Sequence, residues 1–562
     1  MKSPVLAERL SLRRFDLPGW IATVAKVAAI GVALAVTPWL PILGRLEYFL
    51  KVDRYPQATI FLAINAICVA GFVIGPFLRS PFARVPVVAL CISGFAADQL
   101  AIAISGRYLD ETLTTTLWRE KAMIATASSA YFWPMLQVLS WVLPIAVVMA
   151  LKPARPVSLS ARWAIVPAAA LAGCVVIAKI TMNGTTEFPA TFRVPAIAAV
   201  TVLYDTYSGP REELEQLPVP RSRYSKIVMI VDESIRGDFV GINSASQNTT
   251  PFLAGLQHGL TNFGLASSAH NCSAPARLIL RSGLRAADLP DLEEKAFKAP
   301  IIWQFARNAG YRTILIDAFA EVFGTHSFMT KPERAFIDRS IAVSGSPIYM
   351  RDQKIADDIL PSLLASKEPT FIYVNKYGSH FPYRQTYPSN FPPGSPETND
   401  NLNNRAELVA SYRRAVQWSV DEFFRVLLGR IDLADTLIVY TSDHGQSMLD
   451  GGYKLTHCST GSTVHPGEAI VPLFTISSDS AFSRALAATA RMHFGTTTHF
   501  QIFPTLLLAM GYEEAWVASH YGRDSLVRMS EQGRRRFLTG NMFGTGLGAK
   551  WIDVDKANNA VR

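Results

Sequence analysis

Long apolar runs alternate with short polar segments through the first third of the 562-residue chain, and this pattern predicts membrane helices. Each run approaches the roughly 20 apolar residues that a helix needs to cross about 30 Å of hydrocarbon. A cleaved signal peptide does not explain the first run, because four more follow it. We therefore predict a transmembrane domain of five helices within residues 1–181. The runs occupy residues 20–43, 58–78, 85–104, 131–151 and 163–180.

Basic residues are distributed unequally between the loops that join these runs. One set of loops carries nine basic residues against two acids, Glu8 and Asp16, whereas the opposite set mixes both signs almost equally. Lys and Arg concentrate on the cytoplasmic side of membrane proteins, so we expect a cytoplasmic N-terminus. Five crossings then place everything after residue 181 outside the inner membrane, in the periplasm of a Gram-negative bacterium. The nine basic residues are Lys2, Arg9, Arg13, Arg14, Arg79, Arg84, Lys152, Arg155 and Arg162.

A different pattern follows an irregular segment with several prolines at residues 182–224, which we interpret as a linker along the membrane surface. Beyond it, short and continuously apolar runs alternate with helical patterns. This alternation is typical of a mostly parallel sheet that is covered by helices on both faces. We therefore predict an α/β domain at residues 225–562. The expected strands are 226–231, 313–316, 370–374 and 437–440, and the clearest helices are 405–431 and 499–510.

Three of the expected strands end in polar clusters, at residues 232–234, 376–380 and 442–445. In such sheets the ligand site lies beyond the carboxyl ends of the strands. Asp443 and His444 follow one strand directly, and Glu233 follows another. Carboxylate and imidazole ligands with an open position suit zinc, which polarises phosphoryl oxygens. An isolated Asp-His pair is as often part of an ordinary turn, but three clusters at one edge favour a metal site.

The net charge of +9 changes this interpretation little, because loop residues beside the membrane account for much of the excess. We expect membrane lipids with anionic headgroups as partners, and no nucleic acid. Of the five cysteines, only Cys272 and Cys458 belong to the outer domain. An ionisable residue, Asp98, lies within the third apolar run, where burial is costly. Contact with a lipid headgroup amine and an interfacial position are both open explanations for it.

The segments VDESIRGDF, CSAPARL, GSHFPY, TSDHGQS and a later Lys-Leu-Thr-His follow one another in this order. Together with the predicted membrane topology, the series resembles the membrane-bound phosphoethanolamine transferases of the sulfatase-like branch of the alkaline-phosphatase superfamily. The resemblance extends over essentially the whole chain. It implies a five-helix transmembrane bundle that carries a periplasmic α/β domain of the alkaline-phosphatase/sulfatase type.

The resemblance also implies roles for individual residues. Zinc, as one or two ions, would be held by Glu233, Asp443 and His444, with the nucleophile Ser273 as a further ligand; manganese or magnesium fits the family less well. Ser273 stands where the family has threonine, which keeps the hydroxyl needed for a covalent intermediate.

Two histidines complete the implied set. His380 and His457 would bind the phosphate or a second zinc and carry protons to the leaving oxygen, and Arg277 would contact the substrate. Two departures stand out: Phe381 replaces the family's glycine after the first histidine, and the second lies in Thr-His-Cys rather than Leu-His-Gly. The sequence also lacks the family's extra cysteines.

Several alternatives remain open at these positions. Residues 273–277 match the Ser-x-Pro-x-Arg pattern of sulfatases that convert serine to formylglycine, and both branches place the nucleophile on Ser273. Ser273 also suits the start of a helix, where the N-terminus favours an anion. His465 is an alternative to His457, and His270 is more typical of a loop histidine than of a ligand. Cys272 and Cys458 adjoin Ser273 and His457, so a disulfide across the site and two free thiols are equally open.

The expected reaction is the transfer of phosphoethanolamine from phosphatidylethanolamine to lipid A, a core sugar or another envelope glycan of the lipopolysaccharide type. It proceeds through a covalent Ser273 intermediate with zinc, on a multi-pass protein of the inner membrane. The alternatives are a membrane-tethered sulfatase or phosphodiesterase, a phosphoglycerol transferase, and a scaffold without activity. A hydrolase needs no lipid donor and leaves five membrane helices unexplained.

Overall fold

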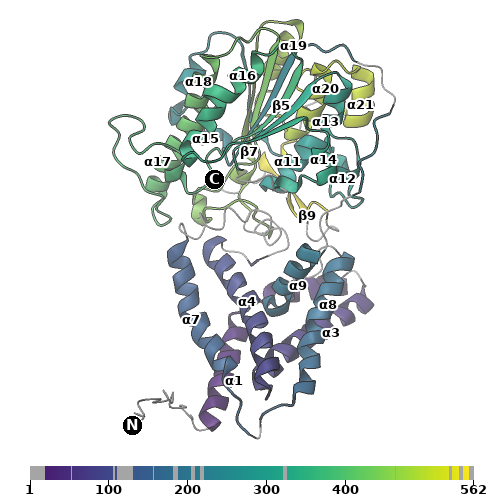
Figure 1. Ribbon diagram of the computed structural model, residues 1–562, viewed down its shortest axis with the longest axis vertical. Coiled ribbons are helices and arrows are strands. Elements are labelled where there is room, and N and C mark those ends of the chain that lie inside the picture. Colours follow the sequence, from purple (N-terminus) through teal and green to yellow (C-terminus); the bar gives the residue numbers. More distant parts are fainter. Residues whose placement is uncertain are drawn as a thin grey trace, which may run out of the picture.

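The protein has two parts, a group of helices and an α/β domain, which lie one above the other in the computed structural model (Figure 1). The structure describes most of the chain, and all statements below concern those residues. They are 19–51, 53–105, 108–109, 131–155, 157–181, 188–203, 209–215, 220–319, 326–461, 464–530, 534–543 and 549–555.

Each of the five predicted membrane runs contains a helix. Segments 55–77, 81–104, 132–150 and 161–178 are long and apolar enough to cross a membrane, and α1, with 17 residues, is a shorter candidate. Most of the exposed large apolar side chains in the described residues lie on these helices, as expected for surfaces in contact with lipid. Four to five candidate spans are therefore confirmed. The helices are α1 (Gly19–Ala35), α3 (Tyr55–Ile74), α4 (Pro81–Ser105), α7 (Phe132–Ala150) and α8 (Ile165–Thr181).

Two further helices correct the expected pattern. Residues Leu40–Lys51 form α2 after a break that divides the first run, and Ala190–Leu203 form α9 within the segment expected to be irregular. α9 packs closely on α4, because a Cβ atom on Gly94 would lie only 2.5 Å from the carbonyl oxygen of Ala190. α9 is therefore packed against a neighbour that is distant in sequence. A linker along the membrane surface remains a prediction for the rest of residues 182–224.

The ionisable residue of the third run finds its counter-ion on α9. Arg193 Nη2 lies 2.5 Å from Asp98 Oδ1, and both side chains are buried. The backbone N–H of Leu109 also donates to Asp98 Oδ1, at 2.7 Å. Asp98 is therefore a packing contact between α4 and α9 in this structure.

The α/β domain is built on a seven-stranded sheet with the order β2-β7-β6-β1-β5-β3-β4. Strands β6, β1, β5, β3 and β4 are parallel, whereas β7 runs antiparallel to both β6 and β2. The four predicted strands are β1, β3, β5 and β6, and the structure adds the others. Their bounds are β1 Lys226–Asp232, β2 Leu260–Ser267, β3 Arg312–Asp317, β4 Arg339–Ala342, β5 Thr370–Asn375, β6 Thr436–Ser442 and β7 Ile470–Ser477.

Helices cover both faces of the sheet (Figure 1). Alternate residues of β1 enter different cores: Ile227 and Met229 pack with Trp303, whereas Val228 and Ile230 pack with Tyr412. Burial on both faces explains why the central strands are apolar throughout. One face carries α13 (Ile302–Asn308), α19 (Ala481–Met492), α20 (Ile502–Ala509) and α21 (Glu514–Tyr521). The other carries α15 (Ile348–Lys354), α16 (Leu360–Leu364), α17 (Arg405–Val416) and α18 (Phe423–Leu428).

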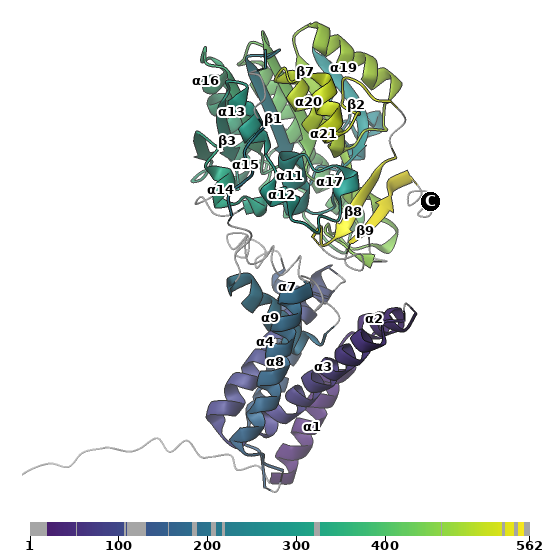
Figure 2. The ribbon, with the colours of Figure 1, turned by 90° about the vertical axis from the view of Figure 1, so that its right-hand side faces the viewer.

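The carboxyl edge of the parallel strands faces the N-terminal helices. After β5, the ring of Phe381 lies 5.7 Å from that of Tyr131, which immediately precedes α7. After β6, Lys454 Nζ donates to the carbonyl oxygen of Ala103 on α4 at 3.0 Å. A small hairpin of β8 (Arg536–Gly540) and β9 (Ala549–Asp553) lies at the same end of the domain (Figure 2). The sheet edge expected to hold the site is therefore turned toward the membrane part.

Candidate active site

Polar side chains from two neighbouring strands and one helix meet at this edge. Glu233 directly follows β1, and Asp443 and His444 directly follow β6, the strand paired with β1 up to the register Asp232↔Ser442. Ser273 is the first residue of α11 (Ser273–Ser282), so its hydroxyl lies at a helix N-terminus, where the first backbone N–H groups have no partner within the helix. Residues that are far apart in the chain thus come together because parallel strands end on one side.

The three predicted ligands form a tight group. One ligand atom each from Glu233, Asp443 and His444 lies within 4.8 Å of the others, and all three residues are buried. Ser273 Oγ lies 2.9 Å from His444 Nε2 and 3.4 Å from Glu233 Oε1. His444 Nδ1 donates to the carbonyl oxygen of Gly445 at 2.6 Å, which turns Nε2 toward the group. The predicted hydroxyl, imidazole and carboxylates therefore share one small volume.

Gly445 allows the chain to turn beside this group. A Cβ atom at this position would lie 2.2 Å from the carbonyl oxygen of Gly467, and the Gly445 N–H donates to the carbonyl oxygen of Glu468 at 2.9 Å. Any side chain would therefore force the loop after His444 away from the segment before β7.

Arg277 lies one helical turn after Ser273 and contacts both carboxylates. Its Nη2 donates to Glu233 Oε2 at 2.7 Å, and its Nε lies 3.1 Å from Asp443 Oδ2. Burial acts against both charges, yet the Arg277 guanidinium holds the pKa of Glu233 well below its usual range. Arg277 Nη1 has no hydrogen-bond partner among the described residues although it is buried. This N–H group is suitably placed to bind an anionic oxygen.

The pKa values of Asp443 and His444 are raised, in contrast to that of Glu233. Burial and the nearby Glu233 carboxylate raise the pKa of Asp443 to about 7. Burial lowers the pKa of His444, but Asp443 and Glu233 outweigh it and raise that pKa to about 9. The group therefore favours bound positive charge, either a proton or a metal ion.

The donor set fits zinc. It offers two carboxylates, one imidazole nitrogen and a hydroxyl, and Asp443 Oδ2 has the ion pair with Arg277 but no hydrogen bond in the described structure. Zinc sites of catalytic type use such Asp/Glu/His ligands and leave one position for the reacting oxygen. Among the described residues, this is the one group of three or more potential metal ligands.

The structure places the two remaining predicted histidines at the border of the group. The ring of His457 stacks on that of His444 with 4.3 Å between centroids. His380 Nδ1 donates to the carbonyl oxygen of Phe381 at 2.7 Å, and its ring contacts the aromatic rings of Phe319 and Tyr377. Burial lowers the pKa of His380, and the charge of Glu233 opposes that shift.

The alternative histidines have structural contacts elsewhere. His465 Nδ1 accepts a hydrogen bond from the backbone N–H of Gly467 at 3.0 Å and so caps the short turn before β7. His270 Nε2 donates to the carbonyl oxygen of Gly540 at 2.9 Å and ties the loop before Ser273 to β8. Neither contact involves the metal-ligand group.

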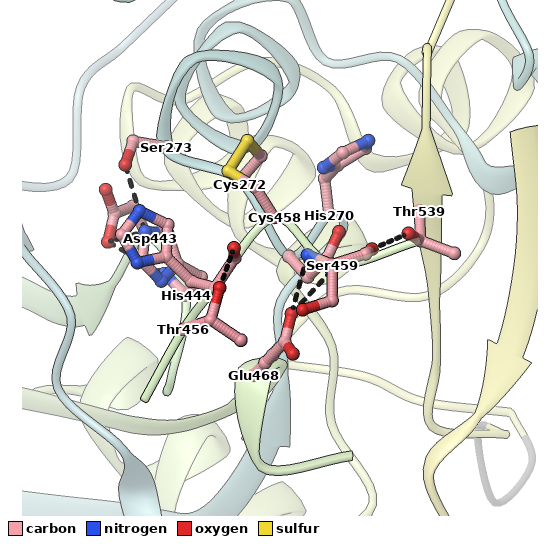
Figure 3. The surroundings of a disulfide bond; sticks show 12 residues. His270, Cys272, Ser273, Asp443, His444, Thr456, Cys458, Ser459, Glu468 and Thr539 are labelled. Carbon is pink, nitrogen blue, oxygen red and sulfur yellow. Dashed lines mark hydrogen bonds and ion pairs between the residues drawn. A yellow bond between two sulfur atoms is a disulfide. The ribbon is translucent and has the colours of Figure 1, made fainter. Parts of the chain in front are cut away.

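A disulfide joins the two loops beside the site, so the alternative of two free thiols is wrong for this structure. Cys272 and Cys458 are bonded with 4.5 Å between their Cα atoms (Figure 3). The bond links the residue before Ser273 to the residue after His457.

A buried carboxylate that sequence reasoning missed holds the same loops. Glu468 Oε2 accepts hydrogen bonds from Asn271 Nδ2 at 2.8 Å and from the backbone N–H of Ser459 at 3.0 Å (Figure 3). Asn271 and Glu468 are 197 residues apart. The one available signal was the position of Asn271 two residues before a candidate nucleophile, and that did not indicate its partner.

Comparisons with known proteins identify the family of the α/β domain. The family model described as "Sulfatase" matches residues 225–512. The Kdo(2)-lipid A phosphoethanolamine 7''-transferase of Escherichia coli (strain K12) is 24% identical over 299 residues, which are 51% of this chain and 51% of that protein. The enzyme of the same name from Salmonella typhimurium is 23% identical over the same shares. The chain thus spans about half the length of the curated relatives it matches.

One solved structure extends the likeness to the membrane part. The integral membrane lipooligosaccharide phosphoethanolamine transferase A from Neisseria meningitidis matches with a TM-score of 0.59 and 18% identity. The match covers 88% of this chain and 97% of that one. It confirms the expected fold, N-terminal apolar helices followed by a sulfatase-type α/β domain.

Proposed function

This chain belongs to the sulfatase family, and we propose that within it the protein transfers phosphoethanolamine from phosphatidylethanolamine to an acceptor of the cell envelope. The observation that carries the proposal is the position of Ser273. Its hydroxyl lies 2.9 Å from His444 Nε2 in the Glu233–Asp443–His444 group, at the sheet edge that faces the apolar helices. A lipid donor explains why such a site faces the membrane part.

The first half-reaction forms a covalent intermediate. Ser273 Oγ gives up its proton and attacks the phosphorus of phosphatidylethanolamine. The bond to the diacylglycerol oxygen breaks, and that oxygen takes up one proton, so none is gained or lost overall. Phosphoethanolamine remains bound to Ser273. His457 and His380, at the border of the group, are the residues suited to deliver the proton.

The second half-reaction reverses the roles of donor and acceptor. An acceptor hydroxyl or phosphate oxygen loses its proton to the same histidines and attacks the phosphorus. The bond between phosphorus and Ser273 Oγ breaks, and Oγ takes up a proton, which restores the serine. Arg277 keeps Glu233 ionised, pairs with Asp443 and offers Nη1 to an oxygen of the phosphoryl group. Zinc bound by Glu233, Asp443, His444 and the Ser273 oxygen would polarise the phosphoryl group and favour the serine alkoxide.

The acceptor is proposed to be lipid A, a core sugar or another envelope glycan. Mass spectrometry of envelope lipids from cells with and without the gene tests the proposal, with a Ser273→Ala strain as control. We expect a lipid or glycan species that carries phosphoethanolamine only when the intact chain is present. Identical lipid profiles in all three strains would contradict a transferase that acts on envelope lipids.

The proposed location is the inner membrane, with the catalytic domain in the periplasm. It rests on the excess of basic residues in one set of loops and on the candidate spans. A reporter that is active only in the periplasm should be active when it is fused after Arg562. The same reporter inserted within residues 152–162 should be silent, and the reverse pattern would contradict the orientation.

A membrane-tethered sulfatase is the second candidate, because residues 273–277 match the Ser-x-Pro-x-Arg pattern. In that case Ser273 would be the precursor of formylglycine rather than the nucleophile itself. The two candidates share the metal ligands and differ in the chemical state of position 273.

A further inference from the structure

A small cavity lies in the catalytic domain away from the group just described. It has a volume of about 310 Å³ and lies between the segment after α11, the start of α20 and the residues that lead into β8. We propose that this cavity binds an anionic sugar of the acceptor glycan. The lining residues are Ala286, Thr498, Phe500, Gln501, Arg534 and Arg536.

The charge of the cavity comes from two arginines with no competing acid. Arg534 and Arg536 are both exposed, and neither forms an ion pair within the described part of the chain. Arg535, between them, is instead bound to Asp555 and to the carbonyl oxygen of Leu265. Neighbouring residues of an extended chain alternate in direction. The first and third arginines can therefore face the cavity while the second holds the hairpin.

The aromatic residues add a surface that suits a sugar ring. Arg536 Cζ lies 4.5 Å from the ring centroid of Trp551 on β9, and the rings of Trp551 and Phe500 are 6.2 Å apart. A guanidinium group held against an aromatic face keeps its N–H groups free for the oxygens of a phosphate or carboxylate. Apolar ring faces combined with cationic forks are the chemistry that recognises phosphorylated or acidic sugars.

The cavity is physically connected to the nucleophile loop. The far end of β8 pairs with that loop, because the Leu538 N–H donates to the carbonyl oxygen of Ala269 at 2.9 Å. Thr539 Oγ1 donates to the carbonyl oxygen of Ser459, beside the disulfide (Figure 3). Ala286 lies just beyond the ten-residue helix α11 that begins at Ser273. At a rise of about 1.5 Å per residue, α11 alone spans roughly 15 Å between the nucleophile and the segment that lines the cavity.

This separation and position fit an acceptor rather than the donor. A distance of that size corresponds to a few sugar units, so a glycan bound in the cavity can present another of its groups to Ser273. The β8–β9 hairpin also lies at the end of the domain nearest the helices (Figures 1 and 2), where a glycan anchored in the membrane surface arrives. The inference rests on the proposed transferase function, and it assigns the cavity to the second half-reaction alone.

The test compares two double variants of the full-length protein in detergent. Arg534→Glu with Arg536→Glu reverses the charge of the cavity. Arg339→Glu with Arg491→Glu makes the same change at two exposed arginines that form no ion pair within the described residues, and it serves as the matched control. The probe is the oligosaccharide released from lipopolysaccharide by complete deacylation. A neutral maltooligosaccharide of similar length is the comparison.

We expect the cavity variant to bind the charged oligosaccharide at least tenfold more weakly than the wild type, by calorimetry, whereas the control variant binds it unchanged. Transfer to the acceptor should show a raised KM with an unchanged kcat, and diacylglycerol release should stay at the wild-type rate. The probe is also treated with phosphatase before the binding measurement. Loss of binding would identify the bound group as a phosphate, and continued binding would identify it as a carboxylate.

Equal affinity of the cavity variant and the wild type would overturn the assignment, as would equal binding of the neutral oligosaccharide by the wild type. Failure of the proposed function is a different result, since the wild type would then release no diacylglycerol. The binding comparison remains readable in that case because it does not depend on turnover.

Discussion

Two consecutive acids at the end of β1 enter two different ionic clusters. Asp232 belongs to an inner cluster: its Oδ2 accepts from Lys376 Nζ at 2.5 Å and from the Tyr440 hydroxyl at 2.8 Å. Its Oδ1 accepts from the backbone N–H of Glu233 at 3.0 Å. Glu233 belongs to the outer cluster with Arg277, His444 and Ser273. Both acids are buried, so burial alone does not separate them.

The two clusters differ in the contacts that their carboxylate oxygens make. In the inner cluster fixed donors meet both oxygens of Asp232, and Lys376 is further bound to the carbonyl oxygen of Ser419. In the outer cluster the acids converge with an imidazole and a hydroxyl, and Asp443 Oδ2 has the Arg277 ion pair but no hydrogen bond in the described structure. A buried acid surrounded by donors stabilises the fold, whereas acids that converge on one point leave ligand positions open.

The largest difference between the clusters should appear when the nucleophile is removed. Ser273→Ala should lower transferase activity by at least about a thousandfold, since the reaction loses its covalent route. The free energy of unfolding should change by less than about 1 kcal/mol, because a half-buried hydroxyl contributes little. Activity and urea-induced unfolding of the purified variant are the measurements. Activity within tenfold of the wild type would remove Ser273 from the mechanism.

Metal content should separate the two clusters next. The double variant Asp443→Ala, His444→Ala should lose its zinc, because carboxylate and imidazole ligands provide most of the binding. The variant Asp232→Asn, one residue before a proposed ligand, should keep more zinc than the double variant. The variant Ser273→Ala should also keep more. Elemental analysis of the purified proteins gives the comparison. Full zinc occupancy in the double variant would show that the metal lies elsewhere.

In the inner cluster the effect should be on stability. Lys376→Met leaves the Asp232 carboxylate buried without its cation, which should cost about 3–5 kcal/mol of unfolding free energy. Burial raises the pKa of Asp232 to about 6 even though Lys376 lowers it, so the variant should raise that pKa further. In the folded variant the Asp232 carboxyl then stays protonated at pH values where the same carboxyl of the unfolded chain, with an ordinary pKa of about 4, is ionised.

The stability of this variant, relative to the wild type, should therefore fall as the pH rises through about 6, where the Asp232 carboxyl of the folded wild type ionises and that of the variant does not. Denaturant unfolding of both proteins at pH 5 and pH 8 measures the difference. A loss of the same size at both pH values would show that Asp232 does not respond to its cation.

The smallest effect is expected at the disulfide between the site loops. Cys272→Ser with Cys458→Ser should lower the free energy of unfolding by about 2–4 kcal/mol, because the bond closes a long loop in the unfolded chain. Metal binding should persist, since none of the proposed ligands is removed. Thermal unfolding with and without a reductant provides the check. A wild type that is insensitive to reductant, together with a double variant of equal stability, would contradict a role of the bond in stability.

The sequence predicted some of the helices and strands and missed others. Long apolar runs identified the membrane helices and the central strands, because burial on all sides leaves an unbroken pattern. Helix α9 contains Pro195 and packs against α4, and this proline is one of those that suggested an irregular segment. Strand β7 contains Pro472, and the short β4 and the β8–β9 hairpin have no long apolar run.

The sequence could predict those site residues that directly follow a predicted strand. Strand ends in a parallel sheet share one edge, which was sufficient to bring Glu233 together with Asp443 and His444. The sequence could not show which of two adjacent acids turns toward Lys376. It also could not show that Arg277 contacts two acids at once, or that Glu468 holds Asn271. These contacts depend on the packing of loops that lie far apart in the chain.

The most direct test of Ser273 as the nucleophile is the intact mass of the protein after incubation with phosphatidylethanolamine vesicles and no acceptor. We predict unmodified serine before incubation, and afterwards an added phosphoethanolamine group that maps to residue 273. Ser273→Thr should form the same adduct and keep appreciable activity, because threonine offers an equivalent hydroxyl. The loss of two hydrogens at position 273, which marks formylglycine, together with an inactive threonine variant, would contradict the transferase and identify a sulfatase.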